Sequence, residues 1–341
     1  MKRRTASGMP AMADVAALAN VSVPTVSRVV QGTVPVSEEK RKRVLAAIEE
    51  LDYRPSATAR ALAHGTSTIV GVFAAQASAY GYAATIEGIH DEARRNGWTV
   101  AVGLLDGGPD GDAADLQRAL DPILTQRLVG AIVIGFDPIA FDTIEILRRR
   151  HRVVVAAGSL ADVEGIDQVH LDDYAGAYEA TTRLLELGHG TVHHVAVPGS
   201  QQQTGRSGGW RAALADAGLS TIPEPWHVSW DPADARDVGL AMPADGSVTA
   251  VLCGNDEIAI GLMRGMGERG IRVPDDVSVI GFDDHPLGRL LTPSLSTVRL
   301  DFTALGERAV AMLAAESPTP SIVAVDPSLH LRESVRPAAS R

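Results

Sequence analysis

Two pairs of polar residues follow short apolar runs and could exchange hydrogen bonds with a small molecule. Asn255 and Asp256 follow the run AVLC, and Asp283 and Asp284 follow the run VSVIGF. Amide and carboxylate groups can each bond two neighbouring hydroxyl groups of a sugar. At the start of a helix, Asn and Asp more often cap backbone N–H groups, and by residue type alone that role is the commoner one for Asn255 and Asp256. In the second pair we expect Asp283 to face a binding pocket and Asp284 to lie in a turn.

An aromatic residue stands in a comparable position, because Trp230 follows the short run WHVS. The face of an indole ring can cover the apolar C–H side of a sugar ring. A tryptophan packed in a protein core is about equally common, so the residue type does not separate the two roles. The place of Trp230 after an expected strand makes it a candidate for ligand binding.

The chain lacks the residue patterns that indicate catalysis or metal binding. His189, His193 and His194 have no acidic or cysteine partners at the spacing of a zinc site. No Ser-His-Asp order, nucleophile elbow or phosphate-binding glycine loop occurs in a suitable context. We therefore expect a protein that binds without catalysing, and we expect no metal ion and no cofactor.

The elements that would position these side chains alternate between β-branched runs and helical stretches from Thr68 onward. The expected strands are 68–73, 99–104, 131–135, 153–157, 168–171, 194–197, 226–229, 250–253 and 277–282, and the helices include 83–96, 174–187, 206–217, 233–242, 256–267 and 302–314. Continuous apolar strands between amphipathic helices predict parallel sheets covered on both faces. Ligands bind at the carboxyl ends of such strands, so the candidate residues should meet in one cleft.

The alternation restarts near residue 167, which indicates two similar α/β lobes joined as a hinged clamp. We place lobe one at about 67–166 and 299–326. Lobe two then covers about 167–298 together with the last strands.

Composition limits the class of protein. The chain has 341 residues, of which 45% are hydrophobic, enough for two or three domains with sizeable cores. Its apolar runs are too short to span a membrane, and MKRRTASG at the start is not followed by the apolar segment of a signal peptide. A single cysteine, Cys253, excludes an internal disulfide. These features predict a cytoplasmic protein without a membrane partner.

The first residues predict a separate helical head. Met12–Arg28 reads as two short helices with a break before Ser22, which can cap the second helix. Pro24 in the first turn of that helix loses no hydrogen bond, because the N–H it lacks would have no partner there. A third helix follows from Ser37 to about Leu51. The first two are typical of a helix-turn-helix, whose second helix enters the DNA major groove, although a helical hairpin without a partner is the structural alternative.

Charge is distributed unevenly between this head and the rest of the chain. Residues 1–66 contain ten Lys or Arg and six Asp or Glu, a net charge of +4. The total is −11, so the remaining residues carry −15. A small basic head on a large acidic body favours a DNA-binding head and a body that stays away from the phosphates, whereas a solvated basic face is the structural alternative.

A short segment, 55–66, connects the head to the body. Ser56 can cap a helix of about two turns from Ala57 to Ala63, which is too short to be stable alone in water. Leu62 on such a helix can pack against a neighbouring domain, or it can act as an apolar wedge between base steps of the minor groove. We expect the segment to become ordered only when a partner holds it.

The segment VAALANVSVPTVSRVVQGTVPVSEEKRKRVLAAIEELDYRPSATARAL resembles the head of the LacI/GalR family of bacterial transcription regulators. The resemblance implies a helix-turn-helix domain at 1–54 and a hinge helix at 55–66. It assigns DNA contacts to Val23, Pro24 and Arg28 at base edges, to Thr25 and Ser27 at phosphates, and to Arg60 and Leu62 in the hinge, with Leu62 as the wedge. Val23 and Pro24 carry no side-chain donors, so we expect contacts with thymine methyl groups there and hydrogen bonds mainly from Arg28.

The body resembles type I periplasmic binding proteins and, from Val192 to Phe302, lac-repressor-like members of the same family. That segment contains VHHVAVPG, GW, ND, GFDD and TVRLDF. The resemblance implies an α/β effector-binding and dimerisation domain at 67–335, whose pocket residues would be Arg206, Trp230, Asn255, Asp256, Asp283 and Phe302. Ser159 stands roughly where lac-repressor-like members carry an aspartate, and the loop 74–83 also departs from their pattern, so the resemblance does not extend to galactoside specificity.

The resemblance implies a homodimeric repressor of carbohydrate-utilisation genes that reads a palindromic operator and is released by a mono- or disaccharide. A response to a nucleobase or a phosphoprotein is the alternative within the class, and a sugar-binding protein without DNA is the alternative outside it. The chain ends at LRESVRPAASR without a heptad helix, so we expect no tetramer of the lac-repressor type.

Overall fold

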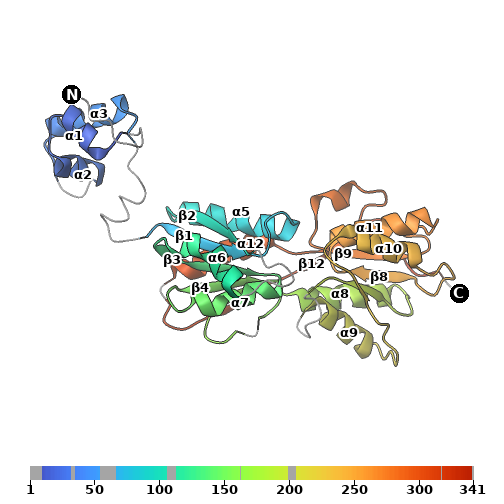
Figure 1. The fold of residues 1–341 in the computed structure, drawn as a ribbon. Helices are drawn as coiled ribbons and strands as arrows, with labels where there is room; N and C mark the ends of the chain where they lie inside the picture. Colours follow the sequence, from blue (N-terminus) through green and yellow to red (C-terminus); the bar gives the residue numbers. More distant parts are fainter. Residues whose placement is uncertain are drawn as a thin grey trace. The chain divides into compact units, whose positions relative to one another are not determined.

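The computed structural model describes residues 10–31, 35–53, 67–105, 113–161, 163–198, 205–315 and 317–339. The chain divides between Thr68 and Ile69 into two compact units, a helical head and a larger α/β body (Figure 1). The expected hinge helix at 55–66, with Arg60 and Leu62, lies outside the described residues.

The described part of the head forms α1 (Met12–Leu18), α2 (Val23–Gln31) and α3 (Glu38–Glu50). The turn between α1 and α2 passes through Asn20, whose φ of 51° lies in the left-handed region that asparagine tolerates better than most residues. The helices pack around a common core that contains Val15, Ala16, Ala19, Val26, Val44, Ala47 and Tyr53. This arrangement confirms the predicted helix-turn-helix followed by a third helix.

The first lobe of the body contains a sheet with strand order β11-β5-β4-β3-β1-β2, in which every neighbouring pair is parallel. Its strands are β1 (Ile69–Ala74), β2 (Thr99–Leu104), β3 (Leu128–Gly135), β4 (Val153–Ala157), β5 (Asp167–Leu171) and β11 (Ile322–Val325). All residues of the central strand β4 are buried. Both faces of the sheet are covered, which is why its central strands are continuous apolar runs.

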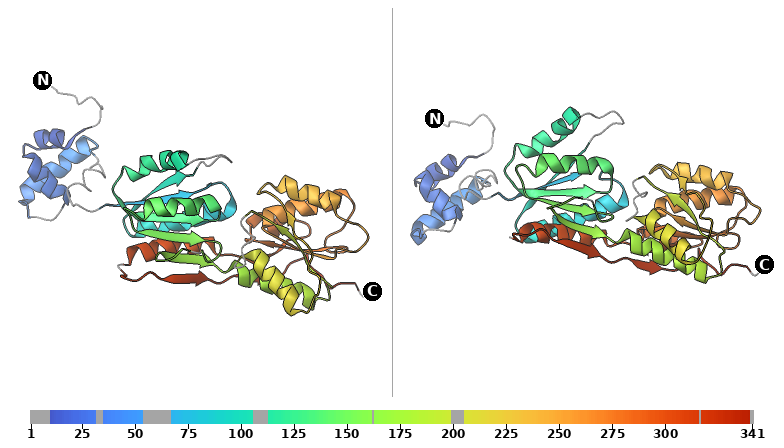
Figure 2. Two further views of the ribbon diagram at one scale, coloured as in Figure 1. Left: turned by 60° about the horizontal axis from the view of Figure 1, so that its bottom comes forward. Right: turned by 90° about the horizontal axis from the view of Figure 1, so that it is seen from below.

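Helices α5 (Tyr80–Arg95) and α12 (Phe302–Ala314) pack on one face of this sheet, and α6 (Ala113–Leu124) and α7 (Pro138–Leu147) pack on the other. Figure 2 shows these layers, with α6 and α7 in green shades and α12 in red. Gly88 of α5 and Gly306 of α12 allow the two helices to approach closely, because a Cβ at either position would overlap with a backbone carbonyl oxygen of the other helix.

The second lobe has strand order β12-β10-β9-β8-β6-β7, and among these pairs only β10 with β12 is antiparallel. Its strands are β6 (His193–Ala196), β7 (Trp226–His227), β8 (Ala250–Cys253), β9 (Ser278–Phe282), β10 (Ser296–Arg299) and β12 (Ser328–His330). Helices α8 (Asp173–Glu186) and α9 (Arg206–Asp216) cover one face, and α10 (Pro232–Ala241) and α11 (Asp256–Glu268) cover the other. A 3-10 helix, η1 (Pro286–Leu290), follows β9.

The structure corrects the boundary between the lobes. We expected the strand at 168–171 to open lobe two, but β5 pairs in parallel with β4 and belongs to the sheet of lobe one. A local pattern predicts a strand without indicating which sheet the strand joins, because one of its neighbours, β11, comes from a distant part of the chain. The chain consequently passes between the lobes at 171–173, 299–302 and 325–328.

Most other expected elements agree with the structure. The segments 99–104, 153–157, 250–253 and 302–314 have the expected bounds, whereas the strand expected at 226–229 is reduced to Trp226–His227. No helix in the described part of the chain is long and apolar enough to cross a membrane.

Candidate functional site in the body and on the head

A pocket lies between the two lobes of the body, at the carboxyl ends of their strands. Its lining includes Gln76, Tyr80, Tyr82, Phe136, Asp137, Ser159, Asp173, Arg206, Trp230, Asn255, Glu257, Asp283 and Phe302. Of the residues expected to contact an effector, Arg206, Trp230, Asn255, Asp283 and Phe302 therefore share one pocket. Ser159 and the loop after β1, whose roles the resemblance left open, lie there too.

Arg206 is the charged centre of the pocket and is only 8% exposed. Its Nε donates to Asp173 Oδ2 at 2.9 Å, its Nη2 lies 3.3 Å from Asp283 Oδ1, and its Nη1 donates to the carbonyl oxygen of Gly254. The guanidinium carbon also lies 4.5 Å from the centre of the Phe282 ring, within cation–π range. These contacts fix the guanidinium, so a ligand meets a positive charge already shared between two carboxylates.

Burial changes the protonation of the two carboxylates beside Arg206. Loss of hydration raises the pKa of Asp173 and that of Asp283 to about 6, and the neighbouring guanidinium opposes the rise. Burial also acts to lower the pKa of Arg206, but attraction by Asp173 and Asp283 outweighs it and raises that pKa. Arg206 therefore remains a cation while the two carboxylates titrate near neutral pH.

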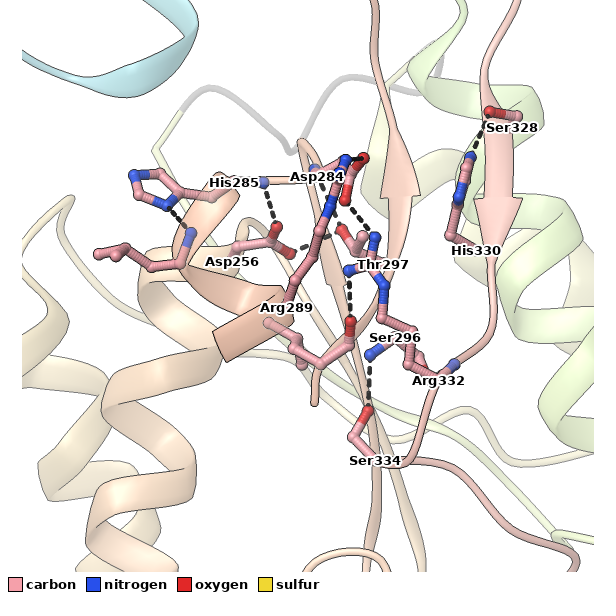
Figure 3. Close-up of polar contacts among 12 residues, drawn as sticks. Asp256, Asp284, His285, Arg289, Ser296, Thr297, Ser328, His330, Arg332 and Ser334 are labelled. Atoms are coloured by element: carbon pink, nitrogen blue, oxygen red, sulfur yellow. Dashed lines mark hydrogen bonds and ion pairs between the residues drawn. The ribbon is translucent and has the colours of Figure 1, made fainter. Parts of the chain in front are cut away.

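Asp283 reaches the pocket through an unusual backbone conformation. Its φ is 102° and that of Asp284 is 55°, both in the region that favours glycine. The N–H of Asp283 donates to the carbonyl oxygen of Val298 at 2.8 Å and holds the turn. The turn separates the two side chains: Asp283 lines the pocket, whereas Asp284 is buried and accepts hydrogen bonds from Arg289 and Arg332 (Figure 3).

The structure corrects the expectation for Asp256, which lies outside the pocket lining. Its Oδ1 accepts from the hydroxyl of Thr297 and its Oδ2 accepts from the N–H of His285, both at 2.6 Å (Figure 3). The residue is 1% exposed, and burial raises its pKa well above the ordinary range. Asp256 therefore ties the start of α11 to β10 and to the turn after β9 instead of offering its carboxylate to a ligand.

Asn255 combines the two roles considered for it. Its Oδ1 accepts from the N–H of Ile258 at 2.8 Å and so caps α11. The residue also lines the pocket. Capping uses the amide oxygen, which leaves the amide Nδ2 as the group that can donate to a ligand.

Aromatic rings form much of the remaining lining. Phe302 meets Tyr80 and Phe136 edge-on, with ring centres 5.9 and 5.8 Å apart, and Tyr82 meets Phe136 with ring centres 4.9 Å apart. Trp230 faces this cluster from lobe two. Trp210 lies outside the pocket: it is fully buried and donates its indole N–H to the carbonyl oxygen of Val192.

Asp137 is a pocket residue that the reading of the sequence missed. Its Oδ2 accepts from the Tyr82 hydroxyl at 2.7 Å, and its Oδ1 accepts from the indole N–H of Trp230 at 3.3 Å. Because Tyr82 belongs to lobe one and Trp230 to lobe two, this carboxylate connects the lobes. A repeat in the sequence could have indicated this role, since the pentapeptide VIGFD occurs at 133–137 and again at 279–283, where it ends in the expected pocket residue Asp283. Strands β3 and β9 thus end alike, and each places an aspartate in the pocket.

Of the three histidines considered for a metal site, two take part in hydrogen bonds, and His193 stacks on the ring of Trp226. His194 contacts the carbonyl oxygen of Leu252 and the hydroxyl of Ser207, and His189 contacts the hydroxyl of Thr249. Within the described ranges, no group of three or more His, Cys, Asp or Glu side chains is placed to hold a metal ion.

On the head, the residues expected to contact DNA lie on α2. Val23, Pro24 and Arg28 are exposed, Val23 at 42% of its surface, and Thr25 and Ser27 are half-buried. The apolar side of the same helix is anchored by Val26, which is fully buried in the core of the head. The helix thus keeps these side chains away from the core, as a recognition helix requires.

Comparisons with known proteins identify relatives of both the head and the body. A model of bacterial regulatory proteins of the lacI family matches residues 11–56, and a model of the periplasmic binding protein-like domain matches residues 181–335. The HTH-type transcriptional repressor PurR of Escherichia coli O139:H28 (strain E24377A / ETEC) is 32% identical over 339 residues, which cover 96% of this chain and 97% of that protein. PurR of Salmonella newport (strain SL254) is 32% identical over 313 residues, 89% of each chain.

Solved structures show the same architecture. The lac repressor dimer bound to operator and the anti-inducer ONPF has a TM-score of 0.84 and 26% identity, with 96% of this chain and 99% of that chain covered. The complex of the transcriptional regulator CelR with cellobiose has a TM-score of 0.68 and 24% identity, covers 96% of this chain and 100% of that chain, and shows the fold alone. The helical head, the two-lobed body and the relatives that match nearly the whole chain lead to one conclusion: the chain belongs to the LacI family and is a DNA-binding transcriptional repressor.

Proposed function

We propose that the chain represses carbohydrate-utilisation genes and that a mono- or disaccharide bound between the lobes releases it from a palindromic operator. The observation that carries this proposal is the grouping of Trp230, Asn255, Arg206 and Asp283 in one pocket. An indole face can cover the apolar side of a sugar ring, while amide, guanidinium and carboxylate groups bond its hydroxyls. Phe302 adds a second aromatic surface.

A ligand in this pocket acts on DNA binding through the angle between the lobes. It contacts residues of both lobes, so it stabilises the interlobe angle at which both sets of contacts form. The crossings at 171–173, 299–302 and 325–328 serve as the hinge. The change in the interlobe angle passes to the head through 55–66. The ligand can weaken DNA binding only as far as its own affinity differs between the DNA-bound and the released conformation.

Helix α2 reads the operator in this proposal. Val23 and Pro24 contact thymine methyl groups, Arg28 bonds a base edge, and Thr25 and Ser27 contact phosphates. Two heads are needed to read the two half-sites of a palindrome, which makes the working form a homodimer.

The hinge residues Arg60 and Leu62 add contacts in the minor groove, where Leu62 is inserted as a wedge between base steps. A protein that acts on genomic DNA works in the cytoplasm of a bacterium. The body binds its effector without catalysing a reaction, as befits relatives that are named transcriptional repressors.

A nucleobase is the second candidate effector. The two relatives compared above by sequence are both named transcriptional repressor PurR, and neither is named as a sugar-responsive protein. The aromatic rings of Tyr82 and Trp230 could stack on a planar base, and Asn255 and Asp283 could bond its edge.

A thermal-shift panel of mono- and disaccharides and of nucleobases, applied to the full chain, separates these candidates. A sugar that raises the melting temperature should also weaken operator binding in a mobility-shift assay. Asp283→Ala should abolish this release while operator binding persists, whereas Asp237→Ala, at an exposed site of the same lobe, should change neither. Stabilisation by nucleobases alone would reject the sugar assignment.

Footprinting tests the DNA reading independently of the effector. We expect protection of a palindromic site at moderate salt, with specific binding weakened much more than nonspecific binding by Leu62→Ala. Equal loss of both kinds of binding would reject the wedge, and a lack of sequence-specific protection would reject the operator.

A further inference from the structure

The residues that line the pocket carry an excess of negative charge. Among those the structure describes, the acids are Asp137, Asp173, Glu257 and Asp283, and the base is Arg206. Arg206 already donates to Asp173 and to a backbone carbonyl, and it pairs with Asp283. A phosphate or carboxylate group on a ligand would therefore enter a site whose net charge is negative.

Two carboxylate oxygens in this cluster have no hydrogen-bond donor. Asp173 Oδ1 and Asp283 Oδ1 are buried, and neither accepts a hydrogen bond from the described residues. Among the described residues, Asp283 Oδ1 forms an ion pair with Arg206 at 3.3 Å, and Asp173 is 7% exposed. A buried acceptor without a donor is unfavourable, so these atoms favour a ligand that brings N–H or O–H groups to them.

A further carboxylate approaches from the opposite lobe. Asp137 accepts one hydrogen bond from Tyr82 and one from Trp230, which leaves acceptor capacity on each of its oxygens. Asp137 and Asp283 end the two VIGFD segments of the chain. A ligand held between the lobes thus meets a carboxylate on both sides.

Aromatic rings complete the surroundings of the carboxylates. Tyr82, Trp230 and Phe302 line the same pocket. The negative face of an aromatic ring attracts a cation within about 6 Å of the ring centre. Carboxylates alone would suit any ligand rich in donors, but carboxylates together with aromatic faces favour a cationic one.

We infer that the effector carries a protonated amine, which the carboxylates of Asp137, Asp173 and Asp283 hold between the lobes. The inference rests on the proposed function, because it concerns the ligand of the same pocket. An ammonium group supplies three donors together with the positive charge that the pocket lacks, whereas a neutral sugar supplies donors only. An amino sugar combines this group with the ring and hydroxyls that Trp230 and Asn255 suit.

Calorimetric titration of the full chain with two matched pairs of probes tests the inference: D-glucosamine against D-glucose, and D-galactosamine against D-galactose. At least one amino sugar should bind about 10-fold more tightly than its parent sugar, a difference of about 1.4 kcal/mol. D-glucose 6-phosphate should bind more weakly than D-glucose. Equal or tighter binding of the parent in both pairs, or no binding of either amino sugar, would overturn the inference.

Substitutions test whether the carboxylates of the pocket cause the preference for an amino sugar. Asp137→Asn keeps the shape of the side chain and should reduce the preference for the amino sugar to about 3-fold or less, while the parent sugar changes by less than about 3-fold. Asp142→Asn removes an exposed carboxylate from α7, the helix that follows Asp137, and should leave the preference unchanged. Asp173→Asn provides a second pocket variant if the first does not fold. An unchanged preference in a folded pocket variant contradicts the assignment.

The outcomes separate this inference from the proposed function. Binding of a neutral saccharide without a preference for the amine refutes the inference and retains a sugar-responsive repressor. Binding of an amino sugar that leaves the operator complex intact supports the inference and refutes release by that ligand.

Discussion

Replacing Arg206 with methionine removes the charge that neutralises the centre of the pocket. Met keeps much of the aliphatic stem of the side chain, so the change isolates the guanidinium and its contacts. Asp173 and Asp283 then lose their shared cation, and the carbonyl oxygen of Gly254 loses its donor. Removing one partner of a buried ion pair costs about 3–5 kcal/mol, and we expect a loss of that size in the free energy of unfolding at about pH 7.5.

The same loss should depend on pH with a definite sign. In the parent protein the pKa of Asp173 and that of Asp283 are about 6, above their ordinary value of 3.8, so the folded state binds more protons than the unfolded state between these values. The free energy that these groups contribute therefore falls as pH rises from about 4 to 6. Arg206 opposes the rise in both pKa values, so its removal moves them higher.

Above about pH 6 the parent protein can ionise these carboxyls because Arg206 neutralises them. The variant must either keep them protonated or bury carboxylates that have no cation beside them. Each pH unit between the old and the new pKa adds about 1.4 kcal/mol per carboxyl to the loss. The loss therefore grows with pH from about pH 6 upward, because both carboxyls contribute to it. At about pH 5 both proteins hold these carboxyls largely protonated, so the loss caused by Arg206→Met should be smaller there than at about pH 7.5.

Urea unfolding at equal protein concentration, followed by tryptophan fluorescence at about pH 5 and about pH 7.5, measures both quantities. Trp210 lies buried on the same helix as Arg206 and reports its environment. Arg211→Met, an exposed change on that helix, is the control and should cost less than about 1 kcal/mol at either pH. An equal loss for Arg206→Met at the two pH values would refute the electrostatic account of the cluster.

Further changes test the head, the packing of lobe two and the link between the lobes. Arg28→Ala should weaken operator binding by about 1–3 kcal/mol and relax base preference at one position in competition assays, and a uniform loss across sequences would assign Arg28 to a phosphate instead. On α11, Gly265→Ala should lower stability by about 1–3 kcal/mol because its Cβ would overlap with a carbonyl oxygen of α10. Gly267→Ala, which faces open space, should raise stability by up to about 1 kcal/mol, and equal thermal shifts would contradict this packing. Trp230→Phe removes the N–H that bonds Asp137 and should weaken effector binding by about 0.5–1.5 kcal/mol in titrations, whereas unchanged binding would show that the link is not used.

Local pattern was sufficient to predict the class of fold and most of its elements. Apolar runs such as 153–157 became buried parallel strands, and the helix-turn-helix followed from helical spacing, a break before Ser22 and Pro24 in a first turn. These features depend on neighbours a few residues apart, so they can be read along the chain. The family followed because the head motif runs over about fifty positions, and the comparisons bear it out.

The sequence predicted five residues of the pocket, but only the tertiary structure decided that Asp256 lies outside it and that Asp137 belongs to it. Asp256 and Asp283 both follow strands, yet Thr297 and His285 take up the carboxylate of the first, while a turn at positive φ directs the second into the pocket. Asp137 connects the two lobes because the fold brings Trp230 of lobe two within hydrogen-bonding distance of it. The physical reason is common to these cases: a polar side chain takes the partner that lies within hydrogen-bonding distance, and here those partners come from segments far away in the sequence.

The same reason explains the lobe boundary. Val169 and Leu171 alternate with polar residues in the segment 167–171, and this local pattern predicts a strand. Whether that strand extends the first sheet or opens the second depends on β4 and β11, which lie on either side of it in space. The sequence by itself therefore determined a two-lobed repressor with a helix-turn-helix head, and long-range pairing determined where the lobes divide and which carboxylates face the effector.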